Sequence, residues 1–96
     1  MDCSEILNRL EHFKARYQEI YRFRKIGIFG SVARQTASEA SDLDVLVEQI
    51  EPDLFLLGAI KADLEKEFGV KVDVIRIRKG MNRYLAKRIS QEAVYV

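Results

Sequence analysis

Three aspartates and one Gly-Ser pair are the residues whose types and spacing suggest chemistry in this 96-residue chain. Gly30 and Ser31 follow an apolar run, and ten residues separate Ser31 from Asp42. Asp42 and Asp44 open a second apolar run, whereas Asp73 lies inside a third, VKVDVIRI. Residues i and i+2 of a strand point to one face, so Asp42 and Asp44 can both reach one metal centre. Carboxylate oxygens suit a hard cation such as Mg²⁺.

Each of these features also has a purely structural explanation. A Gly-Ser pair after a strand is most often a turn, and Asp-x-Asp before an apolar run can be a turn followed by a strand. Asp73 is harder to explain in this way, because Asp disfavours strands and burying an unpaired carboxylate is costly. Three neighbouring carboxylates would repel one another unless a cation compensated their charge. The three features in this order therefore favour a metal site.

The Gly-Ser pair predicts the nucleotide half of such a site. Gly30 has no Cβ, so a triphosphate can approach its backbone closely. Backbone N–H groups at the start of a following helical turn favour an anion, and the Ser31 hydroxyl can donate to a phosphate oxygen. Arg34 can add a charge-assisted contact. We therefore expect Gly30, Ser31 and Arg34 to bind the phosphates.

The remaining segments are expected to hold these residues in place. A helix is predicted over residues 4–22, with Ser4 as N-cap, and a second helix from Pro52 to Gly69. Tyr17 and Tyr21 are expected to pack in or beside the core, not to stack on bases. The expected core-facing stripes are Ile6, Leu10, Phe13, Tyr17 and Ile20 in the first helix, and Leu54, Leu57, Ile60, Leu64 and Phe68 in the second.

Short apolar runs predict the strands, over residues 25–30, 42–48 and 71–77, with an edge strand over 93–96. A helical turn is expected over 31–37, a surface loop over 35–41, and a short basic helix after Asn82. Alternating helices and strands predict an α+β fold of two layers, in which helices pack mainly on one face of a small mixed sheet.

Composition limits the possible classes of protein. With 48% hydrophobic and 32% charged residues, the chain is expected to form a single globular domain over residues 1–96. The net charge of +1 gives no general attraction to nucleic acid or membrane. Cys3 is the single cysteine, and no segment approaches the ~20 apolar residues of a membrane span. We expect a cytoplasmic protein without a membrane partner.

The motifs resemble those of the minimal nucleotidyltransferases in the DNA polymerase β-type nucleotidyltransferase superfamily. The resemblance covers nearly the whole chain from Lys25, and Gln35 stands where the family usually has Gly. The segments that carry it are GSVAR (30–34), SDLDVLVE (41–48), EKEFG (65–69), KVDVI (71–75) and RISQEAVYV (88–96).

The resemblance implies a polymerase β-type fold and a role for each site residue. Gly30 and Ser31 would bind the nucleotide triphosphate. Asp42 and Asp44 would hold two Mg²⁺ ions, and Asp73 would complete the site and assist deprotonation of an acceptor hydroxyl. Proteins of this type are commonly antitoxins that transfer AMP from ATP to a tyrosine of a HEPN ribonuclease toxin. The expected partner is therefore a HEPN toxin.

Two alternatives remain open from the sequence. The chain could be an antitoxin with weak or no activity that neutralises its partner by binding alone, and Gln35 is the residue that would hint at this. An antibiotic nucleotidyltransferase would need more chain to form a drug pocket. The basic segment 76–88 could grip RNA or the nucleotide phosphates, or meet an acidic partner, although a solvated helix face is the favoured interpretation. Tyr84 is its only aromatic residue, so sequence-specific nucleic-acid binding is not expected.

Overall fold

The computed structural model describes residues 2–30 and 43–96. In these residues the chain forms three helices and four strands. Their bounds are α1 Cys3–Tyr21, β1 Phe23–Phe29, β2 Leu43–Gln49, α2 Leu54–Phe68, β3 Val72–Arg76, α3 Arg83–Glu92 and β4 Val94–Tyr95. The predicted helical turn over 31–37 and the predicted loop over 35–41 lie outside the described residues.

The strands form one mixed sheet in the order β3-β2-β1-β4, with β4 at an edge as predicted. β1 runs antiparallel to both β2 and β4, whereas β2 and β3 run parallel. Gly27 allows β4 to approach, because a Cβ at this position would lie 2.4 Å from the carbonyl oxygen of Val94. The predicted α+β fold with a small mixed sheet is confirmed.

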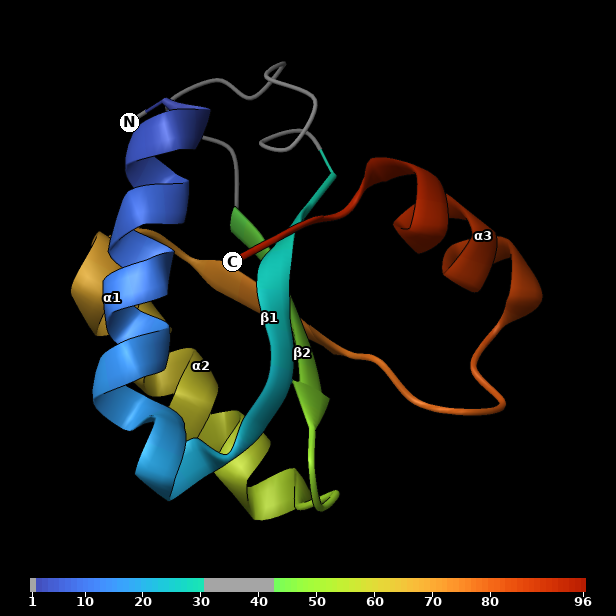
Figure 1. Cartoon of the computed structure of the whole chain (residues 1–96), viewed down its shortest axis with the longest axis horizontal. Coiled ribbons are helices and arrows are strands. Elements are labelled where there is room, and N and C mark those ends of the chain that lie inside the picture. Colours follow the sequence, from blue (N-terminus) through green and yellow to red (C-terminus); the bar gives the residue numbers. More distant parts are fainter. Residues whose placement is uncertain (1, 31–42) are drawn as a thin grey trace.

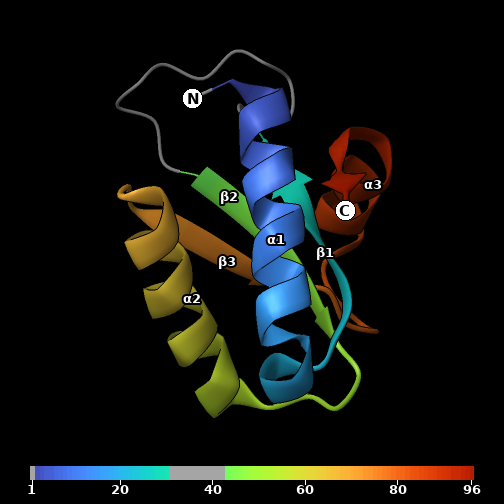
Figure 2. The same cartoon turned by 60° about the vertical axis from the view of Figure 1, so that its left-hand side comes forward.

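The helices lie on both faces of this sheet, with two of them on one side (Figures 1 and 2). α1 and α2 cover one face, and α3 lies against the other. The first face carries the larger core, in which α1 and α2 pack on Ile26, Ile28 and Val45. The second carries a smaller cluster, in which Leu46 and Phe29 pack against α3. The prediction that helices pack mainly on one face is therefore correct.

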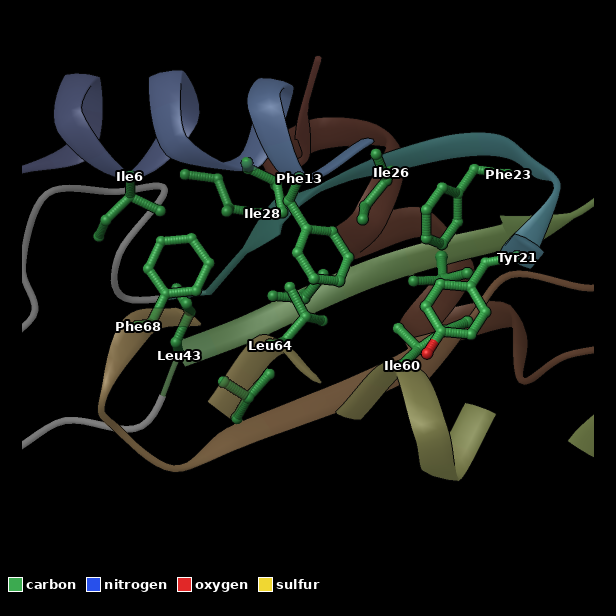
Figure 3. Close-up of a cluster of buried hydrophobic side chains, with 14 residues drawn as sticks. Ile6, Phe13, Tyr21, Phe23, Ile26, Ile28, Leu43, Ile60, Leu64 and Phe68 are labelled. Carbon is green, nitrogen blue, oxygen red and sulfur yellow. The ribbon is translucent and has the colours of Figure 1, made fainter. Parts of the chain in front are cut away.

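The larger core is built from alternate strand residues and from one stripe of each helix (Figure 3). Phe13 lies at its centre with 1% of its surface exposed. Each large apolar side chain buried in this way contributes about 1.5–3 kcal/mol to folding. The strand faces are as predicted. Residues of this core that Figure 3 labels are Ile6, Phe13, Tyr21, Phe23, Ile26, Ile28, Leu43, Ile60, Leu64 and Phe68.

The first helix differs from its prediction at both ends. Its N-cap is Asp2, not Ser4, and the Asp2 carboxylate accepts a hydrogen bond of 2.8 Å from the Glu5 N–H. Ile20, predicted to face the core, is 61% exposed. Tyr21 takes that place: its ring is buried and its hydroxyl donates to the Asp63 carboxylate of α2. The stripe shifts by one residue because the helix ends there, at Arg22, where φ is +51°.

The second helix ends at Gly69 as predicted, but it begins at Leu54, so that Asp53 is its N-cap and Pro52 precedes it. The Asp53 carboxylate accepts from the N–H groups of Phe55 and Leu56, and Gly69 ends the helix with φ at +66°. Leu54, predicted to face the core, is instead 70% exposed. It is the first residue of α2 and lies before the part of the helix that packs on the sheet. Ile60, Leu64 and Phe68 are buried as predicted.

The connection between β2 and α2 is closed by the side chain of Gln49. This buried amide donates to the Asp53 carbonyl at 3.0 Å and accepts from the Asp53 N–H at 3.1 Å. Both halves of the amide are therefore used, and the turn before α2 is fixed to the end of β2. Within the described part of the chain, no helix is both long and apolar enough to span a membrane.

Candidate active site

Asp44 and Asp73 meet on the face of the sheet that α3 covers. They are register partners in the parallel pair of β2 and β3, so they lie on adjacent strands about 4.8 Å apart. Leu46 and Ile75, two residues further along the same strands, pack toward α3 and so identify this face. Asp44 is half-buried and Asp73 is exposed. Two of the three predicted metal-ligating carboxylates are therefore neighbours.

Gly30 lies directly beside this pair, at the end of β1. Phe29 is the register partner of Asp44, and Gly30 continues from it with φ at +80°. A Cβ at Gly30 would lie 2.6 Å from Oδ2 of Asp44, so the Asp44 carboxylate would have to shift to make room for it. The predicted role of Gly30 therefore has a physical basis: a side chain here would occupy the space against the Asp44 carboxylate.

Three of the six predicted site residues lie outside the described residues, namely Ser31, Arg34 and Asp42. Gln35 lies there as well. The structure brings Gly30, Asp44 and Asp73 together at one end of the sheet, which we call the acid end. In residues 2–30 and 43–96, no three His, Cys, Asp or Glu side chains gather in a cluster that could hold a metal ion.

The residues of the acid end nevertheless fit Mg²⁺. Asp44 and Asp73 offer only carboxylate oxygens, which are the donors that Mg²⁺ takes in proteins. One of them is exposed, so a hydrated ion that keeps several waters can reach it.

Arg88 also lies in this region, although the sequence placed it only in the basic segment 76–88 and not among the site residues. Its guanidinium lies 5.2 Å from the centre of the Phe29 ring, and its Nε donates to Glu92 at 3.0 Å. The hydrogen bond and the charge of Glu92 raise the pKa of Arg88, and the charge of Asp44 adds to this. The Arg88–Glu92 spacing of four residues was visible in the sequence. The position over Phe29 was not, because the two residues are far apart in the chain.

The fold and the acid end together define a class of protein. Residues 10–96 match the family model of the nucleotidyltransferase domain. The chain belongs to this nucleotidyltransferase family, and the predicted enzyme class is confirmed.

Within the family, the chain is similar to protein adenylyltransferases. It is 36% identical to protein adenylyltransferase MntA of Thermococcus cleftensis, over 100% of this chain and 97% of the relative. A solved structure named "putative minimal nucleotidyltransferase" is 33% identical, with a TM-score of 0.77 over 98% of this chain and 95% of that one. The resemblance to the minimal nucleotidyltransferases is thereby confirmed.

Two more distant structures share the fold. One is a toxin-antitoxin crystal structure with AMP-PNP, 21% identical, with a TM-score of 0.74 over 93% of this chain and 72% of that one. The other contains the tri-AMPylated HEPN toxin of Shewanella oneidensis in complex with its MNT antitoxin. It is 19% identical, with a TM-score of 0.65 over 93% of this chain and 68% of that one.

Proposed function

We propose that this protein transfers AMP from ATP to a tyrosine hydroxyl of a HEPN toxin and acts as the antitoxin of that toxin, with Mg²⁺ as cofactor. The observation that carries the proposal is the acid end, where Asp44 and Asp73 are register partners and Gly30 lies against the Asp44 carboxylate. The carboxylates provide ligands for a metal ion, and the backbone at Gly30, which has no Cβ, allows a triphosphate to approach closely.

Each of the six predicted site residues has a role in the proposed reaction. Gly30 and Ser31 bind the triphosphate, and Arg34 adds a charge-assisted contact to it. Asp42, Asp44 and Asp73 hold the metal. Mg²⁺ bound at these carboxylates would stabilise the negative charge on the oxygens of the α-phosphate and of the leaving pyrophosphate.

The proposed transfer forms one bond and breaks one. The acceptor oxygen bonds to the α-phosphorus, while the bond from that phosphorus to the oxygen bridging to the β-phosphate breaks, and pyrophosphate leaves with the electron pair. The proton of the acceptor hydroxyl passes to the Asp73 carboxylate. Asp73 suits this role because its side chain is the exposed member of the pair, so an acceptor from outside can reach it.

A partner protein as acceptor is supported by two of the similar proteins. The Thermococcus relative is named a protein adenylyltransferase, and the Shewanella structure pairs an AMPylated HEPN toxin with an MNT antitoxin. The AMP-PNP in the toxin-antitoxin structure supports an adenine nucleotide as the donor. We therefore propose ATP as substrate and a HEPN toxin as partner, in a hetero-oligomer.

The experiment combines the purified chain with radiolabelled ATP, Mg²⁺ and the HEPN protein expected to be encoded beside it. We expect label on the HEPN protein with the wild type, and none above background with Asp44→Asn or Asp73→Asn. Glu11→Gln, which removes an exposed carboxylate from α1, is the matched control and should label as the wild type does. Absence of labelling by the wild type would refute the proposal.

The same variants test the binding-only alternative in cells. If AMP transfer neutralises the toxin, Asp44→Asn should fail to restore growth when the HEPN protein is expressed. Full protection by Asp44→Asn, with complex formation intact, would instead assign neutralisation to binding alone.

A further inference from the structure

A second charged site lies at the end of the sheet opposite the acid end. Here a surface pocket of about 450 Å³ lies between the start of β1, the end of β2 and the segment that follows β3. Four cationic side chains line it, together with one carboxylate. They are Arg24, Arg76, Arg78 and Lys79, with Glu48. We call this site the basic pocket.

The arginines of the basic pocket differ from most other arginines in the described part of the chain. Arg9, Arg16, Arg22 and Arg88 each lie within 4 Å of a carboxylate. Four described arginines make no such ion pair, and three of these four line the basic pocket, namely Arg24, Arg76 and Arg78. Neighbouring cations without such ion pairs repel one another, so a bound anion would stabilise this arrangement.

The basic pocket is separate from the acid end. Glu48 lies four residues beyond Asp44 along β2, and Arg78 lies five residues beyond Asp73. At the rise of a strand these separations correspond to roughly 13 Å for Glu48 and at most roughly 16 Å for Arg78, which lies beyond the end of β3. The basic pocket and the acid end are therefore at opposite ends of β2 and β3.

The chemistry of the lining selects the kind of ligand. Guanidinium groups present paired donors that match phosphate oxygens, and three of the four cations are arginines. None of the described residues that line the pocket is aromatic, so a ligand would be held by its charges and not by stacked bases. The volume is that of an ordinary small-ligand pocket, larger than one phosphate ion needs.

We propose that the basic pocket binds the phosphate groups of a polyanion, independently of the nucleotide used for transfer. The phosphates come either from a single strand of nucleic acid, bound without sequence preference, or from a free polyphosphate. The Glu48 carboxylate opposes this binding because it lies among the cations, so its removal strengthens binding.

The test uses the full chain in a buffer with EDTA, so that no divalent metal occupies the acid end. A fluorescein-labelled oligothymidylate is titrated with protein by fluorescence anisotropy, and inorganic tripolyphosphate and a polyglutamate peptide are added as competitors. We expect binding that weakens with salt, with a slope lowered by roughly 0.7 for each cation removed. Tripolyphosphate is expected to displace the strand, and polyglutamate is not.

Four variants distinguish the basic pocket from general surface charge. Arg78→Ala and Lys79→Ala, both at exposed positions, should each weaken binding by roughly fivefold to tenfold. Glu48→Gln should tighten it by a similar factor. The matched control is Arg83→Ala, which removes an exposed arginine without an ion pair from α3, outside the pocket, and should leave the affinity unchanged.

The outcomes decide both the proposal and the source of the phosphates. Displacement by tripolyphosphate at similar phosphate concentration assigns free polyphosphate, whereas much tighter binding of the strand assigns nucleic acid. Equal losses with Arg83→Ala and Arg78→Ala, or competition by polyglutamate as strong as by tripolyphosphate, would overturn the proposal. So would a lack of any binding by the wild type. AMP transfer is not measured here, so failure of this proposal leaves the proposed function standing.

Discussion

The acid end and the basic pocket lie at opposite ends of the same three strands but carry opposite charge. β2 and β3 begin beside carboxylates, at Asp44 and Asp73, and β3 leads into cations, at Arg76 and Arg78. At the acid end, two like charges are register partners on one face. At the basic pocket, cations come from segments that are not neighbours in sequence. Because β2 and β3 run parallel, both strands start at the acid end and both end at the basic pocket. Their pairing therefore places the carboxylates and the cations at opposite ends of the sheet.

The largest expected difference between the two ends concerns AMP transfer. Asp44→Asn should lower the rate of transfer by about a thousandfold or more, because a metal ligand worth several kcal/mol is lost. Arg78→Ala should leave that rate within about twofold of the wild type, since Arg78 follows the end of β3 whereas Asp73 lies at its start. Initial rates with radiolabelled ATP measure both. Equal losses would mean that the two ends act as one site.

A glycine pair gives the next largest effect. Gly30→Ala should lower transfer by about a hundredfold and destabilise the fold by about 1–3 kcal/mol, because φ is +80° and the new Cβ would meet the Asp44 carboxylate. Gly58→Ala is the control, since nothing lies within 4 Å of a Cβ there. In the middle of α2 that change should stabilise the protein by up to about 1 kcal/mol. Transfer rates and urea unfolding measure both, and normal transfer by Gly30→Ala would contradict the close contact.

Arg88 is a cation at the acid end, so it tests how strictly the ends differ. Arg88→Ala should lower transfer by about tenfold if Arg88 contacts the phosphates of a nucleotide held beside Asp44, since its guanidinium lies over Phe29, the register partner of Asp44. The loss of its ion pair with Glu92 should change the stability little, because ion pairs at the surface contribute little. Arg88→Lys is the control that keeps the charge but not the paired donors. Full activity of Arg88→Ala would show that this cation is structural.

The smallest expected effect concerns the contact between α1 and α2, which belongs neither to the acid end nor to the basic pocket. Burial, followed by the hydrogen bond and charge of Asp63, raises the pKa of Tyr21 from 10.0 to about 12. The folded protein therefore holds this proton more tightly than the unfolded chain. The stabilisation is complete below pH 10 and is lost as the pH rises toward 12.

Urea unfolding between pH 10 and 12 measures this effect. The wild type should lose stability across that range more steeply than Tyr21→Phe, which lacks the hydroxyl. Tyr95, whose pKa burial and then Glu48 also raise, titrates in both proteins and cancels in the difference. Parallel curves for the two proteins would contradict the role of the Tyr21 hydroxyl. Tyr21→Phe should leave AMP transfer at neutral pH unchanged.

Local signals in the sequence predicted much of this structure. Pro52, Asp53 and Gly69 marked the ends of α2, because capping depends on residues next to one another in the chain. Alternation assigned the strand faces for the same reason. The sequence also selected Gly30, Asp44 and Asp73, which the structure brings together.

Other features depend on packing between distant segments and could not be predicted. Periodicity alone placed Ile20 and Leu54 in the core, but it cannot show where a helix passes beyond the edge of the sheet it covers. The pairing of Asp44 with Asp73 required the register of two strands joined by a helix. The basic pocket required the start of β1 and the end of β3 to reach the same end of the sheet, on either side of β2, so in the sequence its arginines resembled ordinary surface charge.

The Gln49 amide described above has a consequence for the chemical ageing of the protein. Deamidation would replace its NH₂ group with a carboxylate oxygen, which would then face the Asp53 carbonyl oxygen where a 3.0 Å hydrogen bond now forms. Two acceptors at that distance repel, so the exchange of a single atom would release the turn between β2 and α2. That turn lines the basic pocket through Gln49, Ile50 and Pro52. An aged sample, one mass unit heavier, should therefore lose affinity for phosphates while its acid end remains intact.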